Sequence, residues 1–232
     1  MYWFFDLDGT LADTDRDIRE AWKAALADLG LDCPNFERDF IAGPPIDEMT
    51  RRLFPDRFTQ ALADAVREGF ARHYDSDGFP NTREYAGVLD VVKALKERGD
   101  FFAIVTNKRF AGATAMARKF GWYAVFDALH TGDMDVAQNL PGAVKLRKSE
   151  LLKRVIRALD APPADCLMIG DTISDFEAAE KCGVRSVGVT WGYGQPDELA
   201  EADFTIDTPA QLLSLRVCTQ SPRSGACRRD GR

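Results

Sequence analysis

The feature that most constrains the fold is an alternation of short apolar runs with amphipathic stretches. The runs have the length and residue types of buried β-strands, and turn residues bound them. They predict strands at residues 2–5, 101–106, 128–131, 166–170, 186–190 and 204–206. The stretches between them predict helices at residues 88–98, 111–120, 150–159 and 175–181, and glycines that favour a left-handed helix end follow near three of these. This alternation is typical of the α/β class, with a doubly wound parallel sheet covered by helices on both faces.

Residues 15–84 interrupt the alternation. They contain no convincing strand, only helical patterns at residues 15–29, 46–54 and 58–74. They could be extra helices packed on the sheet, but roughly 70 residues suffice for a small bundle, so an inserted α-helical cap domain is the better interpretation. We therefore expect an α/β core made of residues 1–14 and 85–216, a cap at 15–84, and a disordered tail at 217–232, where Ser, Gly, Pro and Arg follow no apolar period.

Composition limits the classes of function. The formal net charge is -7, from 30 basic and 37 acidic residues, which argues against general nucleic-acid binding while allowing a locally positive pocket. No uncharged apolar stretch approaches about 18 residues, and the apolar N-terminus is too short for a signal peptide, so we expect no membrane association. The five cysteines are dispersed, as in reduced thiols rather than a disulfide framework or a zinc site, which favours the cytoplasm. A monomer or a homodimer is compatible with the sequence.

Acidic residues follow two of the predicted strands. Asp6 ends the first strand, and Asp8, two residues later, points the same way in extended chain, while Gly9 permits a sharp turn. Asp171 follows the strand at 166–170, and Asp175 opens the next helix, where it could also act as a cap alone. Because ligands bind beyond the carboxyl ends of parallel strands, neighbouring strands would gather these acids into a plausible Mg²⁺ site.

Groups that can bind a phosphate accompany the acids. Thr106 ends the strand at 101–106, and its hydroxyl and the backbone amide of Asn107 could hold phosphate oxygens, although Thr and Asn are also ordinary turn residues. A phosphate beside several carboxylates needs a cation, and Lys145 and Lys148 both precede the helix predicted at 150–159.

Together and in this order, these pieces resemble the haloacid dehalogenase superfamily. Its signature is DxDGT, a hydrophobic strand ending in Thr or Ser, a lysine, and GDxxxD, and the resemblance runs from Met1 to about Leu215. The family's K-x-E-L-L form fits Lys148, which lies 23 positions before Asp171, so Lys148 is preferred to Lys145. The resemblance extends to the phosphoglycolate phosphatase-like branch, which includes 5′-nucleotidase-like members. It rests on the helical insertion and on the segments Gly43–Pro45, Tyr85–Val88 and Thr190–Gly194.

The resemblance implies a role for each residue. Asp6 would be the nucleophile that forms an aspartyl phosphate, and Asp8 the general acid and base. Thr106, the Asn107 amide and Lys148 would bind the phosphoryl group. Mg²⁺ would be held by Asp6, Asp171 and the backbone carbonyl of Asp8, with Asp175 in support.

The resemblance therefore predicts a phosphatase for a small phosphorylated metabolite, such as phosphoglycolate or a nucleoside monophosphate. A phosphomutase of the β-phosphoglucomutase type stays open, because it shares every core residue, and a non-catalytic binding protein of the same fold is the remaining alternative. Three cap arginines could meet a second anionic group of the substrate: Arg51, Arg52 and Arg72.

Overall fold

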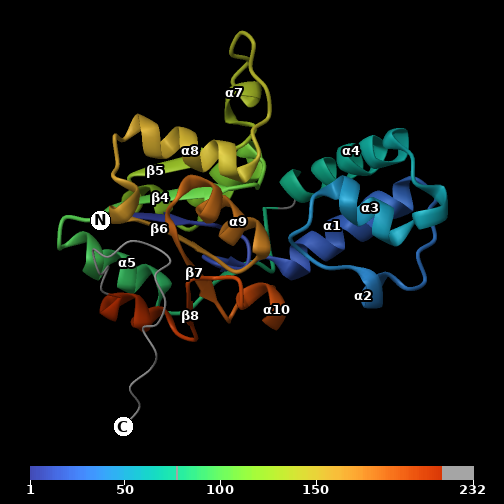
Figure 1. The fold of residues 1–232 in the computed structure, drawn as a ribbon. Coiled ribbons are helices and arrows are strands. Elements are labelled where there is room, and N and C mark those ends of the chain that lie inside the picture. The colour runs from blue at the N-terminus through green and yellow to red at the C-terminus, as the bar shows by residue number, and fades with distance from the viewer. Residues whose placement is uncertain (77, 216–232) are drawn as a thin grey trace.

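A six-stranded parallel sheet forms the centre of the molecule (Figure 1). The computed structural model describes residues 1–76 and 78–215, so the tail predicted at 217–232 lies outside the described residues. The strand order is β5-β4-β1-β6-β7-β8, and every pair is parallel. The strands are β1 (Tyr2–Phe5), β4 (Phe101–Thr106), β5 (Ala128–Thr131), β6 (Cys166–Gly170), β7 (Arg185–Val189) and β8 (Phe204–Ile206). This confirms the predicted α/β class.

Helices cover both faces of the sheet. Alternate residues of β1 point to opposite faces. Trp3 and Phe5 pack in one core cluster with α5 (Val88–Lys96) and α6 (Phe110–Lys119), while Phe4 packs in another with α8 (Lys148–Ala158) and α9 (Ile173–Cys182). Both faces of β1 are therefore buried, which is why its sequence is continuously apolar.

Two helices of the core, α8 and α9, begin two residues before their predicted starts. Helix α8 begins at Lys148 rather than residue 150, because the Glu150 carboxylate accepts a hydrogen bond from the Arg147 backbone N–H at 2.8 Å and caps the helix there. Helix α9 begins at Ile173 rather than residue 175, because Asp175 caps it in the same way from its third position.

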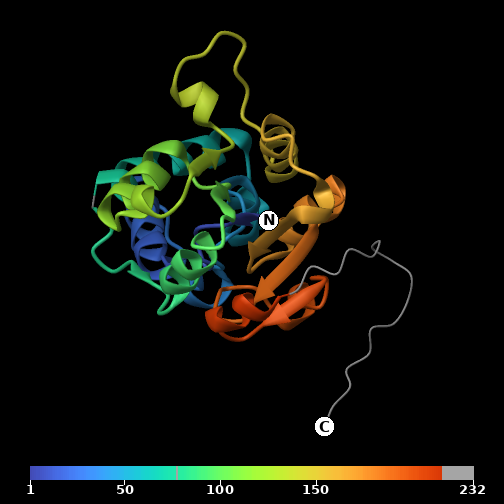
Figure 2. The ribbon, with the colours of Figure 1, turned by 90° about the vertical axis from the view of Figure 1, so that its left-hand side faces the viewer.

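Short elements complete the core. Two four-residue helices are α7 (Met134–Ala137) and α10 (Pro196–Leu199), and 3-10 turns lie at Trp122–Ala124, Pro163–Asp165 and Pro209–Ser214. Figures 1 and 2 show the segment around α7, between β5 and α8, projecting away from the sheet. The segment closes at its base, where the Leu146 backbone N–H donates to the Gly132 carbonyl at 2.8 Å. No helix within the described ranges is long and apolar enough to cross a bilayer.

Residues 15–76 form a helical insert at one side of the sheet (Figure 1). It consists of α1 (Asp15–Asp28), α2 (Phe36–Asp39), α3 (Ile46–Leu53) and α4 (Gln60–Ser76), with a 3-10 turn at Pro55–Arg57. The insert has its own apolar cluster, built around Trp22, Met49 and Val66. A second apolar centre of this kind is what a separate cap requires.

A two-stranded antiparallel ribbon joins the insert to the sheet. It pairs β2 (Ala12–Asp13) with β3 (Arg83–Glu84), so the expectation that residues 15–84 contain no strand is wrong at their last two positions. Both side chains of β3 are exposed, and two residues are too few to display an apolar alternation in the sequence.

Asp17 fastens the first helix of the insert to the returning chain. Its buried carboxylate accepts hydrogen bonds from the backbone N–H groups of Asn81 and Thr82 and from both of their side chains, at 2.6–3.2 Å. Burial alone would raise the pKa of Asp17, but these hydrogen bonds lower it overall, so the group stays ionised. The Asp17 carboxylate therefore holds the entry and exit of the insert together, in addition to the ribbon.

Candidate active site

The acidic and polar residues that end three neighbouring strands meet at one edge of the sheet. β1 lies between β4 and β6, and its last residue, Phe5, is level with Ile104 and Ile169. Asp6, Thr106 and Asp171 stand at or just beyond the ends of these strands, as the order of the motifs predicts. Thr106 is buried, and its Oγ1 accepts a hydrogen bond from the Lys108 backbone N–H at 3.1 Å. Asn107 is exposed.

Lys148 links the first and last acidic motifs. Its Nζ lies 2.7 Å from Asp6 Oδ2 and 2.6 Å from Asp175 Oδ1, and only 4% of its side chain is exposed. Burial opposes the charged form, but the carboxylates of Asp175 and Asp6 raise the pKa of Lys148 above its usual value and hold it protonated. Lys145, by contrast, is exposed in the projecting segment. The geometry thus favours Lys148 as the cation of the site.

Three buried carboxylates form a group suited to a metal ion. One oxygen from each of Asp6, Asp171 and Asp175 lies within 4.8 Å of the others. Asp6 Oδ1 is buried and has no hydrogen-bond partner among the described residues. Asp171 accepts hydrogen bonds from Thr10 Oγ1 at 3.1 Å and from the Tyr193 backbone N–H at 2.7 Å, yet burial and the charges of Asp175 and Asp6 raise its pKa to about 8. This excess of negative charge and the unpaired oxygen fit a hard divalent cation.

The set differs in one member from the predicted metal ligands Asp6, Asp8 and Asp171. The Asp8 carboxylate instead accepts hydrogen bonds from Thr14 and Lys108, at 2.8 Å each, and Asp175 lies in the buried group. A contribution of the Asp8 backbone carbonyl stays a prediction. Asp175 does not merely cap its helix, since it also forms the ion pair with Lys148.

Two glycines make this packing of carboxylates possible. Gly9 has φ +75, and a Cβ atom there would lie 2.1 Å from Asp171 Oδ2. A Cβ atom on Gly170 would lie 2.1 Å from Asp175 Cγ. Any side chain at either position would displace a carboxylate of the group, which explains the glycine in each acidic motif.

Comparison with known proteins identifies the family. Residues 3–189 match the model of the haloacid dehalogenase-like hydrolases. The chain belongs to this family. A 5′-nucleotidase of Pseudomonas aeruginosa is 30% identical over 94% of both chains, and a phosphoglycolate phosphatase of Agrobacterium fabrum is 30% identical over 91% of this chain and 92% of its own. The crystal structure of a haloacid dehalogenase-like family protein from Streptococcus pneumoniae has the same fold, with a TM-score of 0.78 and 24% identity over 92% of this chain and 96% of that one.

Lys108 also belongs to the hydrolase site, although no motif in the sequence points to it. Its Nζ lies 2.8 Å from Asp8 Oδ1 and donates a hydrogen bond to Tyr74 Oη at 2.6 Å. A lysine in a turn after a strand carries no distinctive pattern. Only its position could have indicated that Lys108 lies in the site, because Lys108 follows Thr106 by two residues just as Asp8 follows Asp6. Three further residues of the site were not predicted: Thr14 contacts Asp8, Tyr193 contacts Asp171, and Tyr74 contacts Lys108. An isolated tyrosine or threonine in a sequence gives no indication of such a position.

The three cap arginines considered as possible substrate contacts have partners within the insert. The Arg51 guanidinium lies 3.9 Å from the Phe58 ring centroid, Arg52 donates to the Asp39 carbonyl at 2.7 Å, and Arg72 lies 3.1 Å from Asp28. Another insert arginine, Arg19, lies where the insert faces the core.

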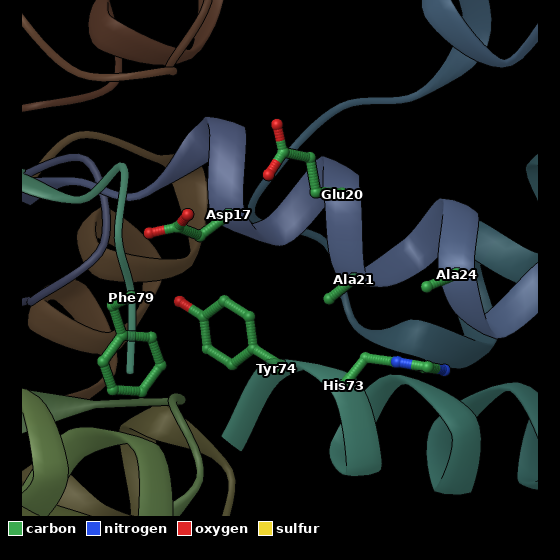
Figure 3. Close-up of a pocket in the computed structure, with 7 residues that line it drawn as sticks. All are labelled: Asp17, Glu20, Ala21, Ala24, His73, Tyr74 and Phe79. Atoms are coloured by element: carbon green, nitrogen blue, oxygen red, sulfur yellow. The ribbon is translucent and has the colours of Figure 1, made fainter. Parts of the chain in front are cut away.

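Arg19 lines a cleft of about 500 Å³ between the insert and the core. Its wall combines four aromatic residues with charged ones, the aromatic residues being Phe40, Tyr85, Trp191 and Tyr193. The cleft adjoins the acidic group through Tyr193, whose backbone N–H binds Asp171. A smaller cavity of about 290 Å³ lies between α1 and α4, where Figure 3 shows Tyr74 beside Phe79 and Asp17 above them.

Proposed function

We propose that this hydrolase is a Mg²⁺-dependent phosphatase that cleaves a small phosphorylated metabolite through an aspartyl phosphate on Asp6. The observation that carries the proposal is the state of Asp6 at the end of β1. Lys148 holds Oδ2 at 2.7 Å, while the buried Oδ1 has no hydrogen-bond partner in the part of the chain that the structure describes. A carboxylate fixed in this way, beside a cation, is prepared to act as a nucleophile toward phosphorus.

Each residue then has a defined task. An oxygen of Asp6 bonds to phosphorus as the ester P–O bond breaks, and Asp8 gives a proton to the leaving oxygen. Asp8 next takes a proton from the water that attacks the phosphoaspartate, which releases inorganic phosphate and restores Asp6. Thr106, the Asn107 amide and Lys148 hold the phosphoryl oxygens. Asp6, Asp171 and the Asp8 carbonyl would hold Mg²⁺, with Asp175 in support, and the ion would neutralise phosphoryl charge.

The insert also has a part in the proposed function. We infer that residues 15–84 act as a cap over a core of residues 1–14 and 85–216. The apolar cluster of the insert and the ribbon at its base support this division. The cap would exclude water from the phosphoryl group and contact the rest of the substrate.

For the substrate, phosphoglycolate-like esters and nucleoside monophosphates are the two classes to test. The relatives named phosphoglycolate phosphatase and 5′-nucleotidase support each class equally by identity. The aromatic wall of the 500 Å³ cleft favours a nucleoside monophosphate, because aromatic side chains stack on a planar base.

A metabolite panel tests the proposal. Purified protein with Mg²⁺ is assayed for inorganic phosphate against 2-phosphoglycolate, nucleoside 5′-monophosphates and sugar phosphates, with Asp6→Asn as the inactive control. Steady release of phosphate that Asp6→Asn abolishes is the expected result. Isomerisation of a sugar phosphate without phosphate release would favour a phosphomutase. Equal phosphate release by Asp6→Asn would contradict the mechanism.

A further inference from the structure

A row of polar side chains runs from the core to the insert beside the candidate acid and base. Asp8 belongs to the core, Tyr74 lies in the last helix of the insert, and Lys108 stands between them. The Lys108 side chain is only 5% exposed, and its ammonium lies 2.8 Å from the carboxylate and 2.6 Å from the phenol oxygen. The contact between insert and core is therefore made directly on a residue of the proposed chemistry.

Only one oxygen of Asp8 takes part in these contacts. Oδ1 accepts hydrogen bonds from Lys108 Nζ and from Thr14 Oγ1, each at 2.8 Å. Within residues 1–76 and 78–215, Oδ2 has no hydrogen-bond partner. Two donors on the same oxygen fix the orientation of the carboxylate and leave Oδ2 as the oxygen available to exchange a proton.

The core holds one of these donors, Thr14, whereas the insert contacts the other, Lys108, through Tyr74. Thr14 is the residue that precedes α1, and its backbone N–H donates to Tyr193 Oη at 2.5 Å. Tyr74 is held by ring contacts, with its centroid 4.9 Å from that of Phe70 and 5.1 Å from that of Phe79. Burial raises the pKa of Tyr74 well above its usual value, so the phenol stays protonated and its oxygen accepts from Lys108. If the insert moved away, Lys108 would lose this acceptor.

We propose that Lys108 is a positioning residue that couples the seating of the insert, through Tyr74, to the orientation of Asp8. Oδ2 is thereby presented for proton transfer when the insert is in place. The inference rests on the proposed function, in which Asp8 protonates the leaving oxygen as the ester P–O bond breaks and later accepts a proton from the attacking water.

Leaving-group dependence separates this role from a merely structural one. Nitrophenolate leaves phosphorus without protonation, whereas an alkoxide needs the proton from Asp8. For Lys108→Met we expect kcat/KM to fall by about 10²-fold on an alkyl phosphate such as a nucleoside 5′-monophosphate, a typical size for general acid catalysis. On p-nitrophenyl phosphate, kcat/KM should stay within about threefold of wild type, since it reports the step that releases the alcohol.

Two further variants complete the experiment. Tyr74→Phe keeps the ring contacts and the Lys108–Asp8 pair, and should show the same selective loss at about three- to tenfold, the size of one hydrogen bond. It also keeps the test decisive if Lys108→Met fails to fold. Lys119→Met is the matched control: Lys119 also joins a core helix to the chain beside the insert, through the Gly78 and Phe79 carbonyls, but does not touch Asp8. Its kcat/KM should match wild type on both esters.

An equal loss on both esters in the folded Lys108 and Tyr74 variants, or no loss on either, would overturn the assignment. Failure of the proposed function would look different, because the wild type and Lys119→Met would then release no phosphate from either ester.

Discussion

At the scale of single residues, two lysines three positions apart have opposite surroundings. Lys148 is buried between Asp6 and Asp175, whereas Lys145 is exposed. Removing a preorganised charge partner of a transition state typically costs about 10²–10³-fold in turnover, which we expect for Lys148→Ala. Lys145→Ala should stay within about threefold of wild type, the small effect usual for a surface change. Phosphate release is measured, with circular dichroism to confirm folding. The reverse ranking in two folded proteins would place the third motif at Lys145.

The buried carboxyl group of Asp171 should make the stability of the metal-free protein depend on pH. Its pKa is raised from 3.8 to about 8, chiefly by burial, so the folded state binds a proton that the unfolded state releases over this range. Stability in the presence of a chelator should therefore be highest near about pH 4 and fall as the pH rises toward about 8. Urea melts at several pH values measure the free energy of unfolding, and Asp171→Asn should make it depend less on pH. If the wild type, in the presence of a chelator, became more stable between about pH 4 and 8, the raised pKa of Asp171 would be contradicted.

At the scale of elements, the join between α1 and the returning chain depends on one buried carboxylate. Asp17→Ala would leave the backbone N–H groups of Asn81 and Thr82 without their acceptor. We expect a loss of about 2–3 kcal/mol in the free energy of unfolding, as for hydrogen bonds to a charged group. Glu20→Ala, on the exposed side of the same helix and also bound to Asn81, should change it by less than about 0.5 kcal/mol. Denaturant melts of both variants measure this free energy. Equal losses in the two variants would show that Asp17 does not hold the join.

At the scale of the whole molecule, the ribbon offers a test of the division into cap and core. Asp13 pairs with Arg83, so a two-residue Asn-Gly turn could replace residues 14–82 and close a short hairpin. We expect the shortened protein to fold, because both faces of the sheet keep their helices. It should hydrolyse p-nitrophenyl phosphate while losing its preference among metabolites. A cooperative thermal transition checks folding, and an unfolded product would show that the insert and core are one unit.

The strands of the central sheet were predictable from the sequence because each is a short apolar run closed by turn residues, unlike those of the two-stranded ribbon. Five of the six sheet strands begin and end at the predicted residues, and the strand at 185–189 is displaced by one. The acidic residues were found because they directly follow such strands. Lys108, Thr14 and Tyr74 were not, since their importance comes from a meeting of segments far apart in the chain. Whether the cap arginines meet the substrate could not be decided, because a sequence does not show whether a charge has a partner nearby.

The order of the strands has a consequence for biosynthesis. Of the six strands of the sheet, β1 is synthesised before the others, yet it lies in the middle of the sheet, between β4 and β6. Its run Tyr2–Phe5 therefore leaves the ribosome with both edges unpaired and both faces apolar, and it finds its first neighbour only after residues 101–106 are made. An unpaired apolar strand is an aggregation hazard, so we expect the nascent chain to need shielding during that interval. Asp6 then meets Asp171 only when most of the polypeptide has been translated.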